Sequence, residues 1–184
     1  MEKKNVLVVV DMQNDFVDGS LGSPEAQAIV DNVVREIQNK DYNYIVYTLD
    51  THETNYLETL EGKNLPVEHC IQDTAGWLLN TKIANAIAER TSMDNYGFSL
   101  CKINRVEKNT FGYEFINDYI PTGVDSITVC GLCTDVCVIS NALVLRMYNR
   151  NVPMYYVEDA CAGVTPEKHK AACNVMESCQ IYKK

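Results

Sequence analysis

Short, unbroken runs of β-branched residues alternate along this chain with longer segments of helical periodicity. Runs that are apolar at consecutive positions are typical of strands covered on both faces, and their alternation with helices is typical of βαβ units in a parallel sheet. Ser23-Pro24 and Thr165-Pro166 mark two helix starts, because serine and threonine cap helices and proline suits the first turn. The pattern predicts strands at residues 5–10, 44–49, 100–106, 126–130 and 152–157, and helices at residues 24–39, 75–90, 113–118, 134–149 and 165–178. We therefore expect an α/β fold.

The composition fits one compact domain over residues 1–184, with 46% hydrophobic residues. The chain has no apolar run near the roughly 20 residues that a membrane-spanning helix needs. The formal net charge of −9, from 16 basic and 25 acidic residues, argues against nucleic acid as a partner. The first apolar run meets Asp11 too soon for a signal peptide. We expect a cytoplasmic protein that binds neither a membrane nor nucleic acid.

Eight cysteines occur in the chain, and most of them lie in apolar runs. Because no export signal is apparent, we expect most to be buried thiols rather than a disulfide framework. A zinc or iron–sulfur site at Cys130, Cys133 and Cys137 is disfavoured, because Cys130 lies in a predicted strand and no fourth ligand follows. Cys137 remains as the candidate for a reactive thiol.

Residues capable of chemistry follow four of the predicted strands. They are Asp11, Asp50-Thr51-His52, Lys108 and the segment from Gly131 to Cys137. In an open α/β sheet, ligands bind beyond the carboxyl ends of the strands. A long irregular stretch, residues 50–74, also begins here, and irregular stretches of that length are usually functional. We expect these groups to converge on one edge of the sheet.

The thiol of Cys137 is predicted to lie in the first turn of a helix that begins near Thr134. Backbone N–H groups and the helix dipole favour a thiolate there, and the same N–H groups could bind an oxyanion. Asp11 is then a candidate general base, and Lys108 a cation that holds carboxylate and thiolate. The structural alternatives are a buried helix cysteine, a turn aspartate and a solvated lysine.

Asp50 and His52, with His69 at the end of the irregular stretch, offer the nitrogen and oxygen ligands typical of a divalent metal site. A glutamate between them could add a carboxylate. The alternative is local hydrogen bonding by His52 and packing by His69. His169 lies among charged residues on an expected exposed helix face and receives no role.

Three segments resemble the signature segments of the isochorismatase-like cysteine hydrolases. They are Asp11-Met12-Gln13-Asn14-Asp15-Phe16, Lys108-Asn109-Thr110-Phe111 and Gly131-Leu132-Cys133-Thr134-Asp135-Val136-Cys137-Val138. Asp50-Thr51-His52 with His69-Cys70 resembles the metal segment of the nicotinamidase branch. The resemblance implies a three-layer α/β/α sandwich around a Rossmann-like parallel sheet of about six strands, in the order 3-2-1-4-5-6.

The resemblance also implies roles for particular residues. Asp11, Lys108 and Cys137 would form the catalytic triad, and a cis peptide bond would join Leu132 to Cys133. Backbone N–H groups of Cys133 and Cys137 would form the oxyanion hole. In this interpretation the backbone of Cys133 matters, whereas its thiol is incidental.

The metal segment departs from the commonest nicotinamidase pattern. Asn55-Tyr56-Leu57 stands where a second histidine is expected, and residues 65–68 lack the tryptophan that often precedes the last histidine. Trp77, the only tryptophan, is expected to pack. By resemblance to members that use a glutamate, Glu61 is the first choice as a further ligand and Glu58 the second. The implied cofactor is a divalent metal, zinc first, with iron or manganese as alternatives.

The implied activity is that of a cysteine amidohydrolase that acts on a small planar amide such as nicotinamide, with nicotinate and ammonia as products. Phe16 and Phe111 would wall the ring, unless they are ordinary core residues. The alternatives are an N-carbamoyl amine or ureide as substrate, or a non-catalytic metal or redox thiol module. An isochorismatase is disfavoured, because its members generally lack the cysteine that Cys137 provides. Homo-oligomers are common in this family, and we expect one here.

Overall fold

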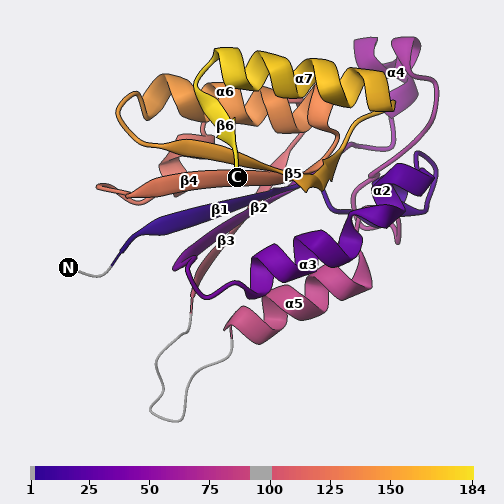
Figure 1. Cartoon of the computed structure of the whole chain (residues 1–184). Helices are drawn as coiled ribbons and strands as arrows, with labels where there is room; N and C mark the ends of the chain where they lie inside the picture. The colour runs from indigo at the N-terminus through magenta and orange to yellow at the C-terminus, as the bar shows by residue number, and fades with distance from the viewer. Residues whose placement is uncertain (1–2, 92–100) are drawn as a thin grey trace.

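The computed structural model describes residues 3–91 and 101–184 and shows a parallel six-stranded sheet in the order β3-β2-β1-β4-β5-β6 (Figure 1). The strands are β1 Asn5–Val10, β2 Tyr44–Asp50, β3 Lys102–Lys108, β4 Ser126–Leu132, β5 Met154–Ala162 and β6 Ile181–Lys183. This architecture confirms the expected α/β fold and the strand order implied by the resemblance.

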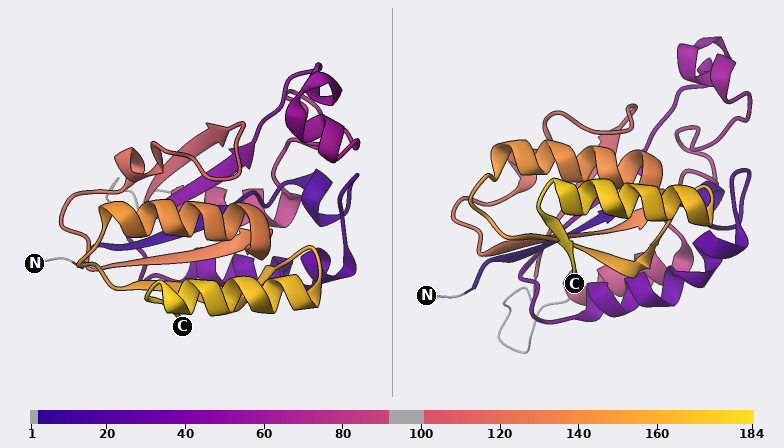
Figure 2. Two further views of the ribbon diagram at one scale, coloured as in Figure 1. Left: turned by 90° about the horizontal axis from the view of Figure 1, so that it is seen from above. Right: turned by 45° about the horizontal axis from the view of Figure 1, so that its top comes forward.

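Helices cover both faces of the sheet, which gives three layers. The pair α3 and α5 lies on one face, and the pair α6 and α7 lies on the other (Figure 1). The short helices α2 and α4 lie near the edge where the strands end, and α4 projects from the body (Figure 2). The helices are α1 Asn14–Val17, α2 Pro24–Ala28, α3 Val30–Gln38, α4 Leu60–Asn64, α5 Thr81–Thr91, α6 Ile139–Tyr148 and α7 Pro166–Ser178. In the described part of the chain, none of these is long and apolar enough to cross a bilayer.

The central strand β1 is deeply buried, and its residues from Val6 to Val10 are fully inaccessible. It pairs in parallel with β2 and β4, so that Val9 lies opposite both Tyr47 and Cys130. At the carboxyl end of β4, Gly131 has a φ of +116°, and a β carbon there would lie 2.1 Å from the carbonyl oxygen of Val10. Only glycine lets the two strands approach so closely beside Asp11.

Both predicted helix caps are present. The hydroxyl of Ser23 accepts the N–H of Ala26, and the hydroxyl of Thr165 accepts the N–H of Lys168. The helix expected over 24–39 is divided near Ile29 into α2 and α3. The helix expected over 75–90 begins only at Thr81, because the side chain of Asn80 caps it by accepting the N–H of Lys82.

Other boundaries also differ from the predictions. The helix expected over 113–118 is only a 3₁₀ turn, Ile116–Tyr119. Leu100, the first residue of the predicted third strand, lies outside the described residues, and β3 extends to Lys108. The stretch 50–74 is less irregular than expected, because it contains the 3₁₀ turn Tyr56–Glu58 and α4. The short β6 was missed, since three residues carry little periodicity.

Candidate active site

The carboxyl ends of β1, β2 and β3 bring three charged side chains together under the turn that follows β4. Asp50 and Lys108 are direct register partners on β2 and β3, and Asp11 follows the last residue of β1. Cys137 comes from a π-helical turn, Thr134–Val138, that leads from β4 into α6. The four side chains expected at one edge therefore meet there, although they are up to 126 positions apart (137 minus 11).

Asp11 is fixed by its backbone as well as by its side chain. Its φ is +48°, in the left-handed region that non-glycine residues rarely adopt. The hydroxyl of Thr48 on β2 accepts the Asp11 N–H at 3.2 Å and donates to Oδ1 at 2.6 Å. The other carboxylate oxygen, Oδ2, lies 2.7 Å from Nζ of Lys108. Burial raises the pKa of the Asp11 carboxyl, and Lys108 opposes that effect.

Lys108 is the cation shared by the whole cluster. Its Nζ lies 3.6 Å from Sγ of Cys137 and 3.5 Å from Oδ1 of Asp50, in addition to its ion pair with Asp11. Burial alone would lower the pKa of this lysine, but the three neighbouring acidic groups outweigh burial and raise it. The side chain is therefore charged although it is fully buried.

Burial and the carboxylate of Asp11 raise the pKa of Cys137 well above the usual thiol value, while Lys108 lowers it. Burial therefore opposes the thiolate that the first turn of the helix was expected to favour. A neutral thiol beside a carboxylate of raised pKa is suited to transfer its proton when it attacks an electrophile.

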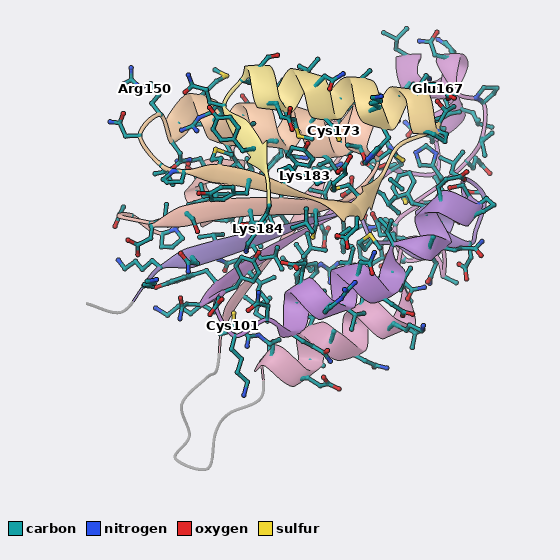
Figure 3. The ribbon with its side chains drawn as sticks, viewed as in Figure 1. Cys101, Arg150, Glu167, Cys173, Lys183 and Lys184 are labelled. Carbon is teal, nitrogen blue, oxygen red and sulfur yellow. The ribbon has the colours of Figure 1, made fainter. Side chains whose placement is uncertain are left out.

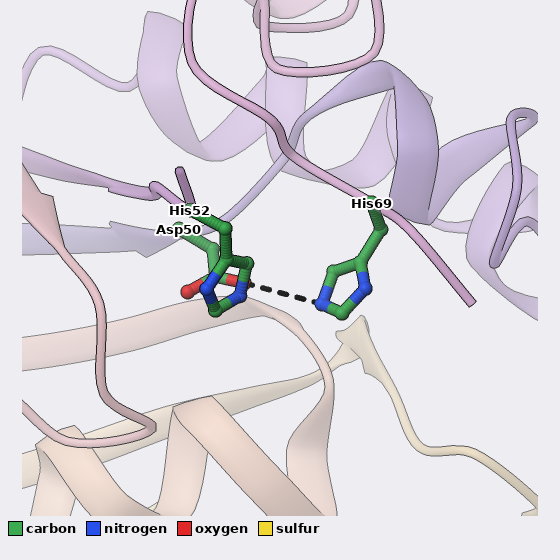
Figure 4. A group of neighbouring side chains, drawn as sticks. All are labelled: Asp50, His52 and His69. Atoms are coloured by element: carbon green, nitrogen blue, oxygen red, sulfur yellow. Dashed lines mark hydrogen bonds and ion pairs between the residues drawn. The ribbon is translucent and has the colours of Figure 1, made fainter. Parts of the chain in front are cut away.

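Asp50, His52 and His69 form a second group, and their ligand atoms all lie within 4.8 Å of one another (Figure 4). Oδ2 of Asp50 is 2.9 Å from Nε2 of His52 and 3.5 Å from Nε2 of His69. Burial would raise the pKa of Asp50, but both histidines and Lys108 outweigh burial and lower it. The carboxylate is therefore ionised, and it links this group to the Lys108 cluster.

The donor set fits a divalent metal. Metal–ligand bonds of about 2.0–2.2 Å at near-tetrahedral angles separate neighbouring nitrogen and oxygen ligands by about 3.4 Å. The two distances from Asp50 to the histidines lie on either side of that value. Nδ1 of His69 is 2.8 Å from the carbonyl oxygen of Val67, so its N–H donates there and leaves the lone pair of Nε2 directed at the group. Such a hydrogen bond behind a metal-ligating histidine is usual.

Of the two glutamates considered from the sequence, Glu61 lies beside this group. Its Oε1 is 3.7 Å from Nε2 of His52 and 3.9 Å from Nε2 of His69, and it is carried by α4. Glu58 is exposed. The ring of Tyr56 packs against both histidines, with centroid distances of 4.7 and 4.9 Å, and Tyr56 lies in the segment where the resemblance led us to expect a second histidine.

A small cavity of about 190 Å³ opens over both groups. It is smaller than the roughly 300–1,000 Å³ pockets that hold drug-sized ligands. Phe16 packs against His69 at a centroid distance of 5.5 Å, and Phe111 is 49% exposed at the rim. The lining residues are mostly apolar: Phe16, Leu21, Ser23, Ala26, Asp50, Glu61, Leu65, His69, Phe111, Leu132, Cys133, Val136, Cys137, Gly163 and Val164.

The peptide bond between Leu132 and Cys133 is cis, as the resemblance implied. Cys133 lines the cavity next to Cys137. None of the eight cysteines is in a disulfide. In the described residues, the groups able to hold a metal do not combine Cys130, Cys133 and Cys137.

The family model for the isochorismatase domain matches residues 5–182. The chain belongs to the isochorismatase family. It is 26% identical over 191 residues to the nicotinamidase/pyrazinamidase of Mycobacterium tuberculosis (strain ATCC 25618 / H37Rv), with 95% of each chain covered. A solved nicotinamidase/pyrazinamidase from Bacillus subtilis superposes with a TM-score of 0.78 at 23% identity, over 98% of each chain. A pyrazinamidase of Pyrococcus horikoshii in complex with zinc superposes with a TM-score of 0.70 at 26% identity, also over 98% of each chain.

Two buried amides support the site of this isochorismatase-family chain, and neither was predicted from the sequence. Gln13 donates from Nε2 to the carbonyl oxygens of Asp50 and Trp77, at 2.8 and 2.7 Å, and accepts the Asp50 N–H at 2.7 Å. Asn141 donates to the carbonyl oxygens of Cys137 and Phe111, at 2.8 and 3.1 Å. The only sequence signal was a polar side chain next to an apolar run. The carbonyl groups of Asp50, Trp77 and Phe111 belong to segments far away along the chain, which no local pattern reveals.

Of two further predictions, the one for Trp77 is confirmed and the one for His169 is wrong. Trp77 packs, as expected: it is buried, and its Nε1 donates to the hydroxyl of Thr51 at 2.9 Å. We expected His169 on an exposed helix face, but it is not exposed. Its ring is half-buried between α7 and the turn after β4, 2.8 Å from the hydroxyl of Thr134.

Proposed function

We propose that the protein is a cysteine amidohydrolase that converts nicotinamide to nicotinate and ammonia. The observation that carries the proposal is the position of Lys108, 2.7 Å from Asp11 and 3.6 Å from the thiol of Cys137, which itself lines a small, mostly apolar cavity. The relatives named as nicotinamidases or pyrazinamidases, which align over nearly the whole chain, support the choice of substrate.

In the first half of the reaction, Asp11 takes the proton of Cys137 while the sulfur attacks the amide carbonyl carbon. The oxygen of the tetrahedral intermediate is bound by the backbone N–H groups of Cys133 and Cys137. Lys108 stabilises the negative charge on Asp11 and on the sulfur throughout. The carbon–nitrogen bond then breaks as Asp11 returns the proton to the leaving nitrogen, which releases ammonia and leaves a thioester.

In the second half, Asp11 takes a proton from a water molecule that attacks the thioester carbonyl. The carbon–sulfur bond breaks, the carboxylic acid leaves, and the proton on Asp11 returns to the sulfur. Asp11 thus acts as base and acid in turn, and its raised pKa makes it a stronger base than an exposed aspartate. The thiol and the carboxylate are restored for the next cycle.

Asp50, His52 and His69, with Glu61, would hold a divalent metal, for which zinc is the first choice and iron or manganese are alternatives. When bound, such an ion acts as a Lewis acid that can hold a polar ring atom of the substrate or a water. Phe16 and Phe111, which both line the cavity, would wall the aromatic ring, and the apolar lining would exclude water from the carbonyl. We also infer that the protein is a cytoplasmic homo-oligomer. Light scattering tests its oligomeric state.

Ammonia release from purified protein tests the proposal, with nicotinamide, pyrazinamide, N-carbamoyl amines and ureides as substrates. We expect turnover of nicotinamide, and a Cys137→Ala variant should lose at least about 1,000-fold in kcat. Cys133→Ala is the matched control, because Cys133 contributes only its backbone and should retain activity. Activity confined to carbamoyl compounds would overturn the substrate, and near-full turnover by Cys137→Ala would overturn the mechanism.

A further inference from the structure

A second group of metal-ligating side chains lies away from the cavity, between α7 and the sheet. It consists of Glu158 on β5 with His169 and Cys173 on α7, and its ligand atoms all lie within 4.8 Å of one another. Figure 3 labels Cys173 on α7 and Lys183 on the adjoining β6. Nothing in the proposed reaction uses these three side chains.

The helix geometry brings the imidazole and the thiol together. His169 and Cys173 are four positions apart and therefore lie on the same face of α7. Nε2 of His169 is 3.6 Å from Sγ of Cys173. In a tetrahedral zinc site, a zinc–sulfur bond of about 2.3 Å and a zinc–nitrogen bond of about 2.05 Å separate these two atoms by about 3.6 Å. The pair already has the spacing that a shared ion requires.

The other ring nitrogen of His169 has a fixed partner. Nδ1 is 2.8 Å from the hydroxyl oxygen of Thr134, which is fully buried. When Nδ1–H donates to this hydroxyl, the lone pair of Nε2 points at Cys173 and Glu158. This is the arrangement by which histidine ligands of metals are usually oriented, and it parallels the one at His69, where Val67 is the acceptor.

The surrounding charges favour a cation. The negative charges of Glu158 and Glu177 interact electrostatically with the Cys173 thiol, and Lys183 is the basic group that opposes them. Lys183 pairs with Oε2 of Glu158, but its side chain is 58% exposed, and pairs of this kind contribute little. Tyr156 donates its hydroxyl to Glu177 at 3.0 Å. Because the Glu158 side chain is 37% exposed, an ion can reach the group from solvent.

We propose that Glu158, His169 and Cys173 bind a second divalent ion of the zinc class, with one coordination position left to water. A thiolate, an imidazole and a carboxylate together suit zinc or cobalt, whereas magnesium and calcium prefer oxygen ligands alone. Binding displaces the thiol proton to solvent, since thiolate is the form that ligates the metal. The site lies one hydrogen bond, through Thr134, from the turn that carries Cys137.

Cobalt titration of metal-free protein tests this site without reference to activity. A cobalt–thiolate bond gives a near-ultraviolet charge-transfer band, which nitrogen and oxygen ligands do not give. We expect the intensity of this band to increase until one equivalent of cobalt is bound by a thiolate. The Cys173→Ser variant should lose the intensity that belongs to this one equivalent, and the Cys179→Ser variant should be unchanged. Cys179 is the matched control, because it follows the same helix at its C-terminal end.

Two variants that leave the buried thiol in place complete the test. Glu158→Gln and His169→Gln should each weaken cobalt binding in this band at least tenfold, and circular dichroism checks that the variants fold. A cobalt spectrum and stoichiometry that are the same in wild type, Cys173→Ser and His169→Gln would overturn the site. A failure of nicotinamide turnover would leave this result untouched, so the two proposals are separable.

Discussion

The Lys108 ammonium is enclosed by three groups that can carry negative charge: Asp11, Asp50 and Cys137. A buried charge without partners is strongly disfavoured in a protein interior, so each group in this cluster depends on the others. Lys108 therefore has two effects. It opposes the effect of burial on the pKa of Asp11, and it stabilises the sulfur when the Cys137 proton leaves.

Replacing Lys108 by methionine should test both effects. We expect Lys108→Met to destabilise the fold by about 3–5 kcal/mol, because it leaves buried carboxylates unpaired, and to lower kcat strongly. Lys102→Met is the control, since Lys102 lies on the same strand but is exposed, and it should change stability by less than about 0.5 kcal/mol. Urea unfolding and ammonia release measure the two results. Equal stability of the two variants would contradict the electrostatic account.

At this scale the sequence predicted which charged residues meet, because parallel strands present their carboxyl ends at one edge. Asp11, Asp50 and Lys108 could be placed by that rule alone. It could not reveal Gln13 or Asn141, whose amides bind the carbonyl oxygens of Asp50 and Phe111, which only the complete fold brings near. It also could not reveal that burial raises the pKa of the Cys137 thiol, because burial depends on tertiary packing.

Among the elements, long periodic segments were predicted better than short ones. The caps at Ser23 and Thr165 are local signals and were predicted correctly. The short α4 was missed although Thr59 caps it, because five mostly exposed residues show no apolar face. That helix matters for function, since it brings Glu61 to the two histidines. Short polar elements near sites are thus where sequence periodicity is weakest.

The close approach of β1 and β4 gives a prediction for the elements. Gly131→Ala should destabilise the protein by clearly more than Gly123→Ala, because its β carbon would meet the Val10 carbonyl oxygen at 2.1 Å. At Gly123 the φ is also positive, at +68°, but nothing lies within 4 Å, so we expect only the backbone cost of about 1 kcal/mol. Urea midpoints measure both. Similar losses in the two variants would show that strand separation does not constrain this position.

For the whole molecule, the order of the strands was available only through the resemblance. Periodicity predicts a parallel sheet, but which strands are neighbours depends on contacts between segments far apart in the chain. The order matters because it puts β1 between β2 and β4, and so places Asp11 between the Asp50 group and Cys137. The group at Asp50 then joins the end of β2 to the segment at His69, with Glu61 of α4 beside it, so that a metal bound there would connect three parts of the fold.

This connection links metal binding to global stability. Zinc added to chelator-treated protein should raise the Tm, because an ion that binds only the folded state stabilises it by about 2.7 kcal/mol at 100 times its Kd. The measurement is made in the Cys173→Ser background, so that the second proposed site does not contribute. Glu61→Gln should reduce the zinc-dependent shift in Tm, whereas Glu58→Gln should not, because Glu61 lies within 3.9 Å of both histidines and Glu58 is exposed. If zinc left the Tm unchanged, or if both glutamine variants behaved alike, the group at Asp50 would not bind metal through Glu61.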